Sequence, residues 1–392
     1  MKCRILLGLT VLGLLTQLPM PVRLAAESTV GESHSRFISF DAPGAGERIY
    51  EGTFGVGINS SGQITGYYAD ASFVYHGFLR SPEGAFTTFD APDAGAYGTF
   101  PYGLNSDGTI VGLYSHVAYV EHGFLRHPDS TFATFTDPDA CTTADGTGCY
   151  GSRFFDINDS GEIAGSYVDA NFVFHSFLLN NGGALTVFEA PGAGDVTGSY
   201  QGTQPAIFSA LNNHGEVIGS YTDASNVEHG FSRSADGTIT DFDAPGAGTG
   251  SGQGTFPVSL TDTGVIAGAY IDASSVYHAF LRNSDGTITN FDAPGAGTGV
   301  SQGTIPENIN ANGEITGNYI DGNNVSHGFL TASNGVIVTF DAPGAGKENG
   351  ATGCGSTSGC PGTYPYSNNA SGEITGYYID GRNRSHGFLR TP

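Results

Sequence analysis

The sequence predicts an all-β fold, a seven-bladed β-propeller with four antiparallel strands per blade. Three observations predict it. A unit of about 52 residues recurs seven times. Each copy holds four short strand-like segments separated by Gly, Asn and Asp turns, as in propeller blades. Finally, the repeats open with a strand that the last copy lacks, so the two ends of the chain are expected to meet.

Residues 1–26 have the pattern of a secretory signal peptide. Lys2 and Arg4 precede an apolar run, 5–15, that is too short to cross a bilayer as a helix, and small residues follow at 24–26. We therefore expect a secreted or extracellular protein, which in a bacterium means the periplasm or the cell surface.

After the signal peptide, we expect a short N-terminal segment, 27–35, and a single propeller, 36–392. No later stretch is apolar and long enough to predict a membrane span. The chain has 14 cations and 38 acids, a formal charge of −24, and loss of residues 1–26 removes three cations and no acid. Such a charge repels nucleic acid and favours a soluble chain, which we expect to be a monomer.

The sixth copy illustrates the four expected strands. The first ends at Ile309-Asn310, and the others are 314–319, 325–330 and 336–340. Asn-Gly and Asp-Gly turns separate them, and a linker of sequence Asp-Ala-Pro-Gly-Ala-Gly leads to the next copy. We number the copies as repeats one to seven by their histidines: His76, His122, His175, His229, His278, His327 and His386.

The pairing of the second and third strands follows from two constant spacings. In every repeat a tyrosine precedes the histidine by eight residues and a glycine precedes a phenylalanine by 12, as in Tyr68/His76 and Gly66/Phe78. Both pairs share one turn centre, so Tyr should face His and Gly should face Phe. A phenyl ring covering a cross-strand glycine is a stabilising pair.

Strand order predicts how the ring closes. The chain begins with a strand, Arg36 to Phe40, of the kind that ends the other repeats, and the last repeat stops after its third strand. The N-terminal strand should therefore complete the last blade. The alternative, an open β-solenoid, would have no use for this arrangement and would show atypical terminal repeats.

The repeat resembles a family of extracellular repeats named for a His-Ala-Phe signature. That motif stands as His278-Ala279-Phe280, five repeats carry His-Gly-Phe, and His175-Ser176-Phe177 departs slightly. The resemblance covers about residues 37–390. It implies an exported, propeller-like repeat protein and assigns no shared catalytic residue.

Four cysteines follow the signal peptide, in two local pairs. In an oxidising compartment we expect the disulfides Cys141–Cys149 and Cys354–Cys360. A four-cysteine metal site is the alternative, but neither pair has the two-residue gap typical of zinc knuckles.

Residues that recur in every repeat are most simply explained by structure. We expect each histidine to be a buried polar link and the recurring aspartates to cap turns. The alternative for these aspartates is a calcium site on one rim. No residue is assigned to metal or cofactor binding, and none is assigned as catalytic.

Function is expected where the repeats differ, just after the linker and along the first strand. Varied aromatic and polar residues there fit a binding mouth for a glycan or a peptide. The alternative is ordinary packing of a channel plug. The candidate ligand-binding residues are Phe54, Phe100, Tyr102, Arg153, Phe155, Gln204, Phe256, Glu307, Tyr364 and Tyr366.

The sequence therefore predicts a secreted, non-enzymatic binding or structural module with a ligand surface at one rim. The alternative is a carbohydrate-active hydrolase or lyase working in the channel mouth. Its acid, base or cation would come from Asp156, Glu307 or Arg153, which belong to different repeats.

Overall fold

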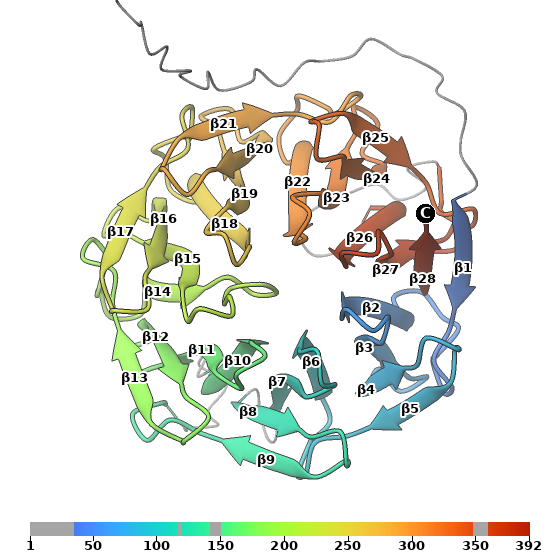
Figure 1. Ribbon diagram of the computed structural model, residues 1–392, viewed down its shortest axis with the longest axis horizontal. Helices are drawn as coiled ribbons and strands as arrows, with labels where there is room; N and C mark the ends of the chain where they lie inside the picture. The colour runs from blue at the N-terminus through green and yellow to red at the C-terminus, as the bar shows by residue number, and fades with distance from the viewer. Residues whose placement is uncertain (1–34, 116–119, 142–149, 348–359) are drawn as a thin grey trace, which may run out of the picture.

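The computed structural model describes residues 35–115, 120–141, 150–347 and 360–392, and the regular structure of these ranges is entirely β. The expected signal peptide and almost all of the segment 27–35 lie outside them. The 28 strands surround a central axis, with the outermost strands forming the rim (Figure 1). No helix in the described ranges is long and apolar enough to span a membrane.

β1 (Arg36–Phe40) precedes the first repeat, and each repeat then begins with a strand nearest the axis. These first strands are β2 (Gly52–Ile58), β6 (Gly98–Leu104), β10 (Ser152–Ile157), β14 (Gly202–Pro205), β18 (Gly254–Leu260), β22 (Gly303–Ile309) and β26 (Gly362–Asn368). The second strands are β3 (Ile64–Ala69), β7 (Ile110–Ser115), β11 (Ile163–Val168), β15 (Val217–Thr222), β19 (Ile266–Ile271), β23 (Ile315–Ile320) and β27 (Ile374–Ile379).

The third strands carry the histidines. They are β4 (Tyr75–Arg80), β8 (Glu121–Arg126), β12 (Phe174–Leu179), β16 (Glu228–Arg233), β20 (Tyr277–Arg282), β24 (Ser326–Thr331) and β28 (Ser385–Thr391). The outer strands are β5 (Phe86–Phe89), β9 (Phe132–Phe135), β13 (Leu185–Phe188), β17 (Ile239–Phe242), β21 (Ile288–Phe291) and β25 (Ile337–Phe340).

Consecutive strands of a repeat pair antiparallel, as β22–β23, β23–β24 and β24–β25 do in repeat six. The predicted register of the second and third strands is confirmed in all seven repeats, where Tyr faces His and Gly faces Phe. The glycine is required at Gly66, because a Cβ there would lie 2.0 Å from the Phe54 carbonyl oxygen and 2.9 Å from the Phe78 ring.

Neighbouring repeats meet at the glycine that starts each first strand. Gly52 has φ +119°, and a Cβ there would lie 1.9 Å from the carbonyl oxygen of Ser385 in repeat seven, which lies next to repeat one. The next residue, Thr53, accepts a 2.9 Å hydrogen bond from the Ala42 N–H of the linker. The recurring Gly-Thr pair therefore joins one repeat to the next, and its threonine hydroxyl fixes the linker by a hydrogen bond.

The predicted pairing of the chain ends is present. β1 pairs antiparallel with β28, with Ile38 opposite Leu389 and Ser39 opposite Phe388 (Figure 1). The innermost strand of repeat one, β2, also forms a parallel bridge to β28, between Gly52 and Ser385. The N-terminal and C-terminal strands thus belong to one sheet, and the β28 edge is not left open.

Hydrogen bonds between turn residues link neighbouring repeats around the channel. The side-chain amide of Asn59 donates to the carbonyl oxygen of Asn105, 3.1 Å away, and Asn369 donates to that of Asn59, also at 3.1 Å. We call this set the asparagine ring; its donors are Asn59, Asn105, Asn158, Asn212, Asn310 and Asn369. Repeat five has Thr261 at this position and makes no such donation.

The hydrophobic core is divided among the repeats and lies between neighbouring sheets. One cluster combines Phe40 and Leu389 from the chain ends with Ile64, Tyr68 and Phe78 of repeat one. Arginines at the ends of third strands cover an outer-strand phenylalanine of the previous repeat at 4.7–5.0 Å. These pairs are Arg80/Phe40, Arg126/Phe89, Arg233/Phe188, Arg282/Phe242 and Arg390/Phe340.

The histidines are structural, as expected, but they are not buried. His76 stacks on Tyr68 at 5.0 Å between ring centroids, and its side chain keeps 22% exposure. Its Nδ1 lies 2.8 Å from Asp90 and its Nε2 lies 3.7 Å from Asp70. The expectation of burial was wrong because the histidine lies at the start of the third strand, near the rim, where two acidic turns flank the imidazole.

Of the expected disulfide partners, Cys149 and Cys354 lie outside the described residues. Cys141 and Cys360 are both buried. The two pairings therefore stay predictions.

Candidate functional site

The first strands, which lie nearest the channel, are bulged in all repeats but repeat four. In six of them the ladder to the second strand shifts by one residue, as between Pro101 and Gly103 in β6, and leaves one side chain outside the ladder. These residues are Val56, Tyr102, Phe155, Val258, Glu307 and Tyr366. The channel lining is thus mostly apolar and aromatic.

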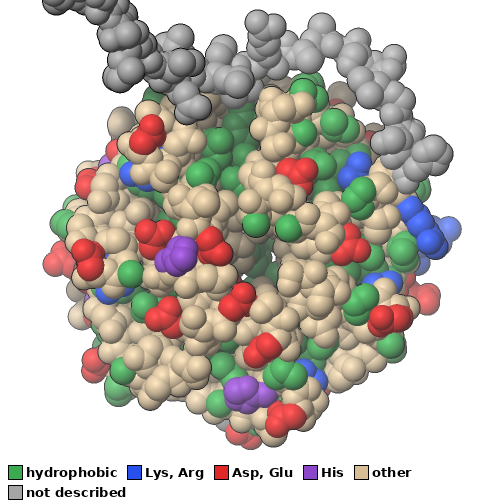
Figure 2. Space-filling view, in the orientation of Figure 1, with side chains coloured by type: hydrophobic (Ala, Val, Ile, Leu, Met, Phe, Trp, Pro, Cys, Tyr) green, Lys and Arg blue, Asp and Glu red, His purple; other side chains and the backbone are tan. Residues whose placement is uncertain are grey.

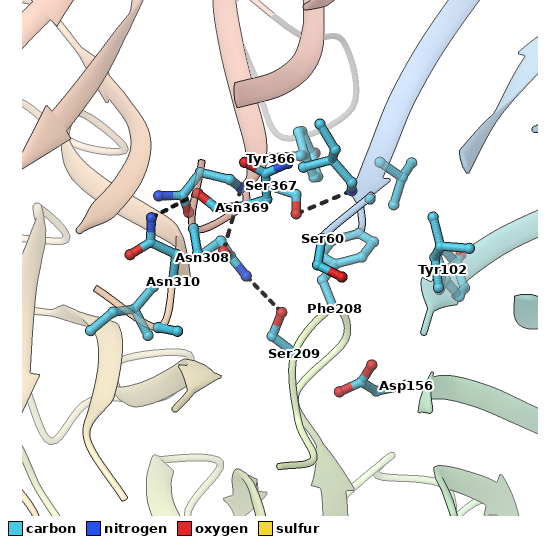
Figure 3. A pocket seen from close by; sticks show the side chains of 18 residues that line it. Ser60, Tyr102, Asp156, Phe208, Ser209, Asn308, Asn310, Tyr366, Ser367 and Asn369 are labelled. Carbon is cyan, nitrogen blue, oxygen red and sulfur yellow. Dashed lines mark hydrogen bonds between the residues drawn. The ribbon is translucent and has the colours of Figure 1, made fainter. Parts of the chain in front are cut away.

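Repeat four departs from this pattern. Its chain takes 11 residues from Gly202 to Asn212, where repeat two takes 8 from Gly98 to Asn105. β14 stops at Pro205, and the added residues carry Phe208 across the channel (Figure 3).

Phe208 contacts aromatic rings from two distant repeats. Its ring centroid lies 5.5 Å from that of Tyr102 and 5.2 Å from that of Tyr366, both in edge-on geometry. Phe155 lies beside Tyr102 at 6.2 Å. Four repeats thereby contribute to one aromatic group within the channel.

Beside this group lies a cavity of about 290 Å³. It opens where the first strands end and the asparagine turns begin. Three aromatic side chains, Tyr102, Phe208 and Tyr366, line it together with hydroxyl, amide and carboxyl groups (Figure 3). The polar lining residues are Ser60, Asp156, Ser209, Asn308, Asn310, Ser367, Asn368 and Asn369. None of the residues lining the cavity is Lys or Arg.

A hydrogen-bond network fixes the polar wall. The Asn308 side-chain amide donates to Ser209 Oγ at 2.8 Å and lies 3.3 Å from Ser259 Oγ. Ser367 Oγ accepts from the Ile58 N–H at 3.4 Å. The wall is therefore held in place before any ligand binds, which lowers the entropy cost of binding.

Asp156 lies in the cavity wall, but both of its carboxyl oxygens already accept hydrogen bonds from the backbone. Its Oδ1 accepts from the Ile157 N–H at 2.9 Å and its Oδ2 from the Leu211 N–H at 3.0 Å. Burial raises the pKa of Asp156 to about 7, although these N–H groups act in the opposite direction. The second bond holds the end of the repeat-four insertion, so Asp156 positions the loop that carries Phe208.

Glu307 is the other channel carboxyl. It occupies the bulge of β22, and burial raises its pKa to about 8. Tyr377 and burial raise the pKa of Tyr366, and burial raises the pKa of Tyr377. Glu307 lies close enough to both phenols for its charge to raise the two pKa values further.

Only two of the ten predicted binding residues, Tyr102 and Tyr366, line the cavity. Phe54, Phe100 and Tyr364 lie nearer the other end of the first strands and pack on neighbouring tyrosines. Phe54 stacks on Tyr67 at 5.0 Å, and Tyr364 stacks on Tyr377 at 4.9 Å. Phe54 also contacts Tyr377 of repeat seven, and Phe100 contacts Tyr67 of repeat one, so these rings pack both within and between repeats.

The other predicted residues are placed differently. Arg153 forms an ion pair with Glu121 and covers the Tyr150 ring at 4.6 Å. Gln204 and Phe256 are partly exposed on β14 and β18, and Phe155 is buried beside Tyr102. The cavity thus lies at the opposite end of the first strands from the mouth that the sequence predicted.

Sequence reasoning missed Phe208, Ser209 and Asn308. The signal for the first two was the extra length of repeat four, which marks an insertion directed at the axis. The recurring rim aspartates cap turns, as expected: Asp70 Oδ1 accepts from the Ser72 and Val74 N–H groups. Within the described ranges, no three or more His, Cys, Asp and Glu side chains are grouped to hold a metal ion.

No family model matches the chain, and a search of curated proteins finds no match. Solved structures do show similarity. The puromycin hydrolase S511A mutant complexed with PGG aligns with a TM-score of 0.50 at 14% identity, over 84% of this chain and 50% of that one. This chain therefore spans about half the length of puromycin hydrolase.

Two fungal proteins align at lower scores. AofleA from Arthrobotrys oligospora gives a TM-score of 0.45 at 12% identity, over 80% of this chain and 92% of that one. The fucose-specific lectin from Aleuria aurantia gives 0.42 at 10% identity, over 73% and 94%. At these identities the similarity concerns the fold alone.

Proposed function

We propose that the chain is a secreted seven-bladed β-propeller, four strands per blade, that binds a saccharide without acidic groups in its channel cavity and does not chemically change it. The grouping of strands by repeat and the pairing of β1 with β28 support the blade count. The observation that carries the function is the cavity beside Tyr102, Phe208 and Tyr366.

The cavity's chemistry suits sugars. Aromatic rings offer flat apolar faces to the C–H side of a pyranose, while the amide and hydroxyl groups opposite can pair with its hydroxyls. Because no Lys or Arg lines the cavity and the chain is strongly acidic, phosphate or sulfate groups are poor ligands. Figure 2 shows the same imbalance on one face, where acidic side chains outnumber basic ones.

The hydrolase alternative is less well supported. A glycosidase needs two carboxyl groups facing one bond, one as acid and one as base or nucleophile. Asp156 lines the cavity, but backbone N–H groups occupy both of its oxygens, and the other carboxyl, Glu307, lies beside the cavity, next to Asn308 in the chain, and not across it from Asp156 in the lining. This arrangement favours binding over catalysis.

Isothermal titration calorimetry with β-linked neutral trisaccharides tests the proposal. The wild-type protein should bind at least one of them, and Tyr366→Ala should weaken that binding at least about tenfold, the loss expected for one stacked aromatic. Tyr50→Ala is the control, because Tyr50 is 54% exposed and does not line the cavity. Equal losses in both variants, or no binding to the wild type, would contradict the proposal.

A further inference from the structure

Glu307 differs from every residue at the same position in the other first strands. Those residues are aliphatic or aromatic, and packing alone would be served by another valine such as Val56 or Val258. A carboxyl in a largely apolar channel lowers stability unless something pairs with it. The position therefore calls for an explanation other than packing.

No protein group provides that pairing. In the described ranges, the Glu307 carboxyl has no hydrogen bond and no ion pair, and burial is the one cause of its raised pKa. Other acids in the molecule are engaged: Glu121 pairs with Arg153, and Glu314 accepts from the Asn310 amide at 2.8 Å. Glu307 is left to interact with whatever enters the channel.

Its surroundings are aromatic. Tyr366 and Tyr377 lie near the carboxyl, with their ring centroids 5.6 Å apart, and Phe208 follows at 5.2 Å from Tyr366. A carboxylate beside aromatic faces attracts an organic ammonium group, through its charge and through the ring quadrupoles. The adjacent residue, Asn308, lines the saccharide cavity.

We propose that Glu307 forms a subsite for a protonated amine, so that the channel prefers a saccharide carrying a free amino group. This inference rests on the proposed function and names the ligand class within it. The sugar ring would occupy the cavity beside Tyr366 and Phe208, and its ammonium group would pair with Glu307. In the empty channel the raised pKa of Glu307 keeps much of the carboxyl protonated near neutral pH.

Three β-1,4-linked trisaccharides that differ at C2 test this inference: those of glucosamine, N-acetylglucosamine and glucose. The wild-type protein should bind the glucosamine trisaccharide about tenfold or more tightly than the other two, as expected for a hydrogen bond between charged partners. Glu307→Gln should abolish this preference while keeping the affinity for the glucose trisaccharide. Glu162→Gln, which alters an acid that bonds Asn158, with neither residue in the cavity lining, should keep the preference.

The two proposals fail in different ways. Equal binding of all three sugars by the wild type, or an unchanged preference in Glu307→Gln, overturns the amine subsite and leaves the saccharide cavity standing. Failure of all three to bind overturns both. Thermal unfolding of Glu307→Gln shows whether it is folded; a melting temperature at or above that of the wild type at pH 8 is expected, because the variant buries no ionisable group.

Discussion

At the residue scale, the glycine that starts each first strand has the strictest steric requirement. Gly52 combines a left-handed φ of +119° with a backbone oxygen 1.9 Å from the place of a Cβ. Both features are absent at Gly381, where nothing lies within 4 Å of an added Cβ. Other repeats carry alanine at the position of Gly381, as at Ala71 and Ala224.

Gly52→Ala should therefore lower the free energy of unfolding by at least about 2 kcal/mol, since both strain and a backbone clash act there. Gly381→Ala should change it by less than about 0.5 kcal/mol. Denaturant unfolding measures both. Similar effects in the two variants would show that the contact between repeats is not as tight as described.

The histidines give a pH dependence of known sign. The hydrogen bond to Asp41 is the largest influence on His386 and raises its pKa, and Asp341 does the same for His327. A raised histidine pKa contributes stability that is complete below the unfolded value of about 6.5 and is lost as the pH rises through the folded value. The melting temperature should fall over that window, and His386→Gln should reduce the fall. A variant with an unchanged pH profile would contradict this account.

At the element scale, the asparagine ring has a gap at repeat five. Thr261 accepts the bond from Asn212 at 3.2 Å but cannot donate to repeat six as an asparagine would. Thr261→Asn should close the gap and raise the free energy of unfolding by about 1 kcal/mol, the net value of one hydrogen bond.

Ser274→Asn is the control, because this exposed turn position already holds asparagine in repeats three and six, at Asn171 and Asn323, whose amides donate to an aspartate of the same turn. It should leave stability unchanged. If Thr261→Asn were neutral or destabilising while the control was neutral, the ring would have no energetic role. Thermal unfolding of both variants measures the difference.

Elements that repeat could be predicted from sequence, and the element that does not repeat could not. The Tyr/His and Gly/Phe spacings fix the hairpin register, because one turn centre serves both pairs. The path of the insertion near Phe208 depends instead on contacts from other repeats, such as the Asp156 bond to Leu211. Spacing within one repeat carries no information about such contacts.

At the scale of the whole molecule, closure depends on residues at opposite ends of the chain. Arg36 lies opposite Thr391 in the β1–β28 pair, and neither is buried. The double variant Arg36→Cys/Thr391→Cys should form a disulfide without disturbing the core and should raise the melting temperature in its oxidised form. Each single variant is the control. Failure of the pair to crosslink would contradict closure by β1.

The same scale explains why the cavity was only partly predicted. Sequence variation among repeats pointed to the first strands, and two of the residues it singled out, Tyr102 and Tyr366, lie in the cavity. It could not show which end of the channel is hollow, since that depends on how six bulged side chains and one insertion fill a shared space. The charge of Glu307 is visible in the sequence, whereas the lack of a protein partner for its carboxyl among the described residues is visible only in three dimensions.

The position of a bound sugar tests the central claim most directly. A crystal structure of the protein with a trisaccharide that binds in calorimetry should show the sugar in the cavity at the end of the first strands, against Tyr102, Phe208 and Tyr366. Density for the sugar at the opposite rim instead, beside the linkers and Tyr50, would contradict the account.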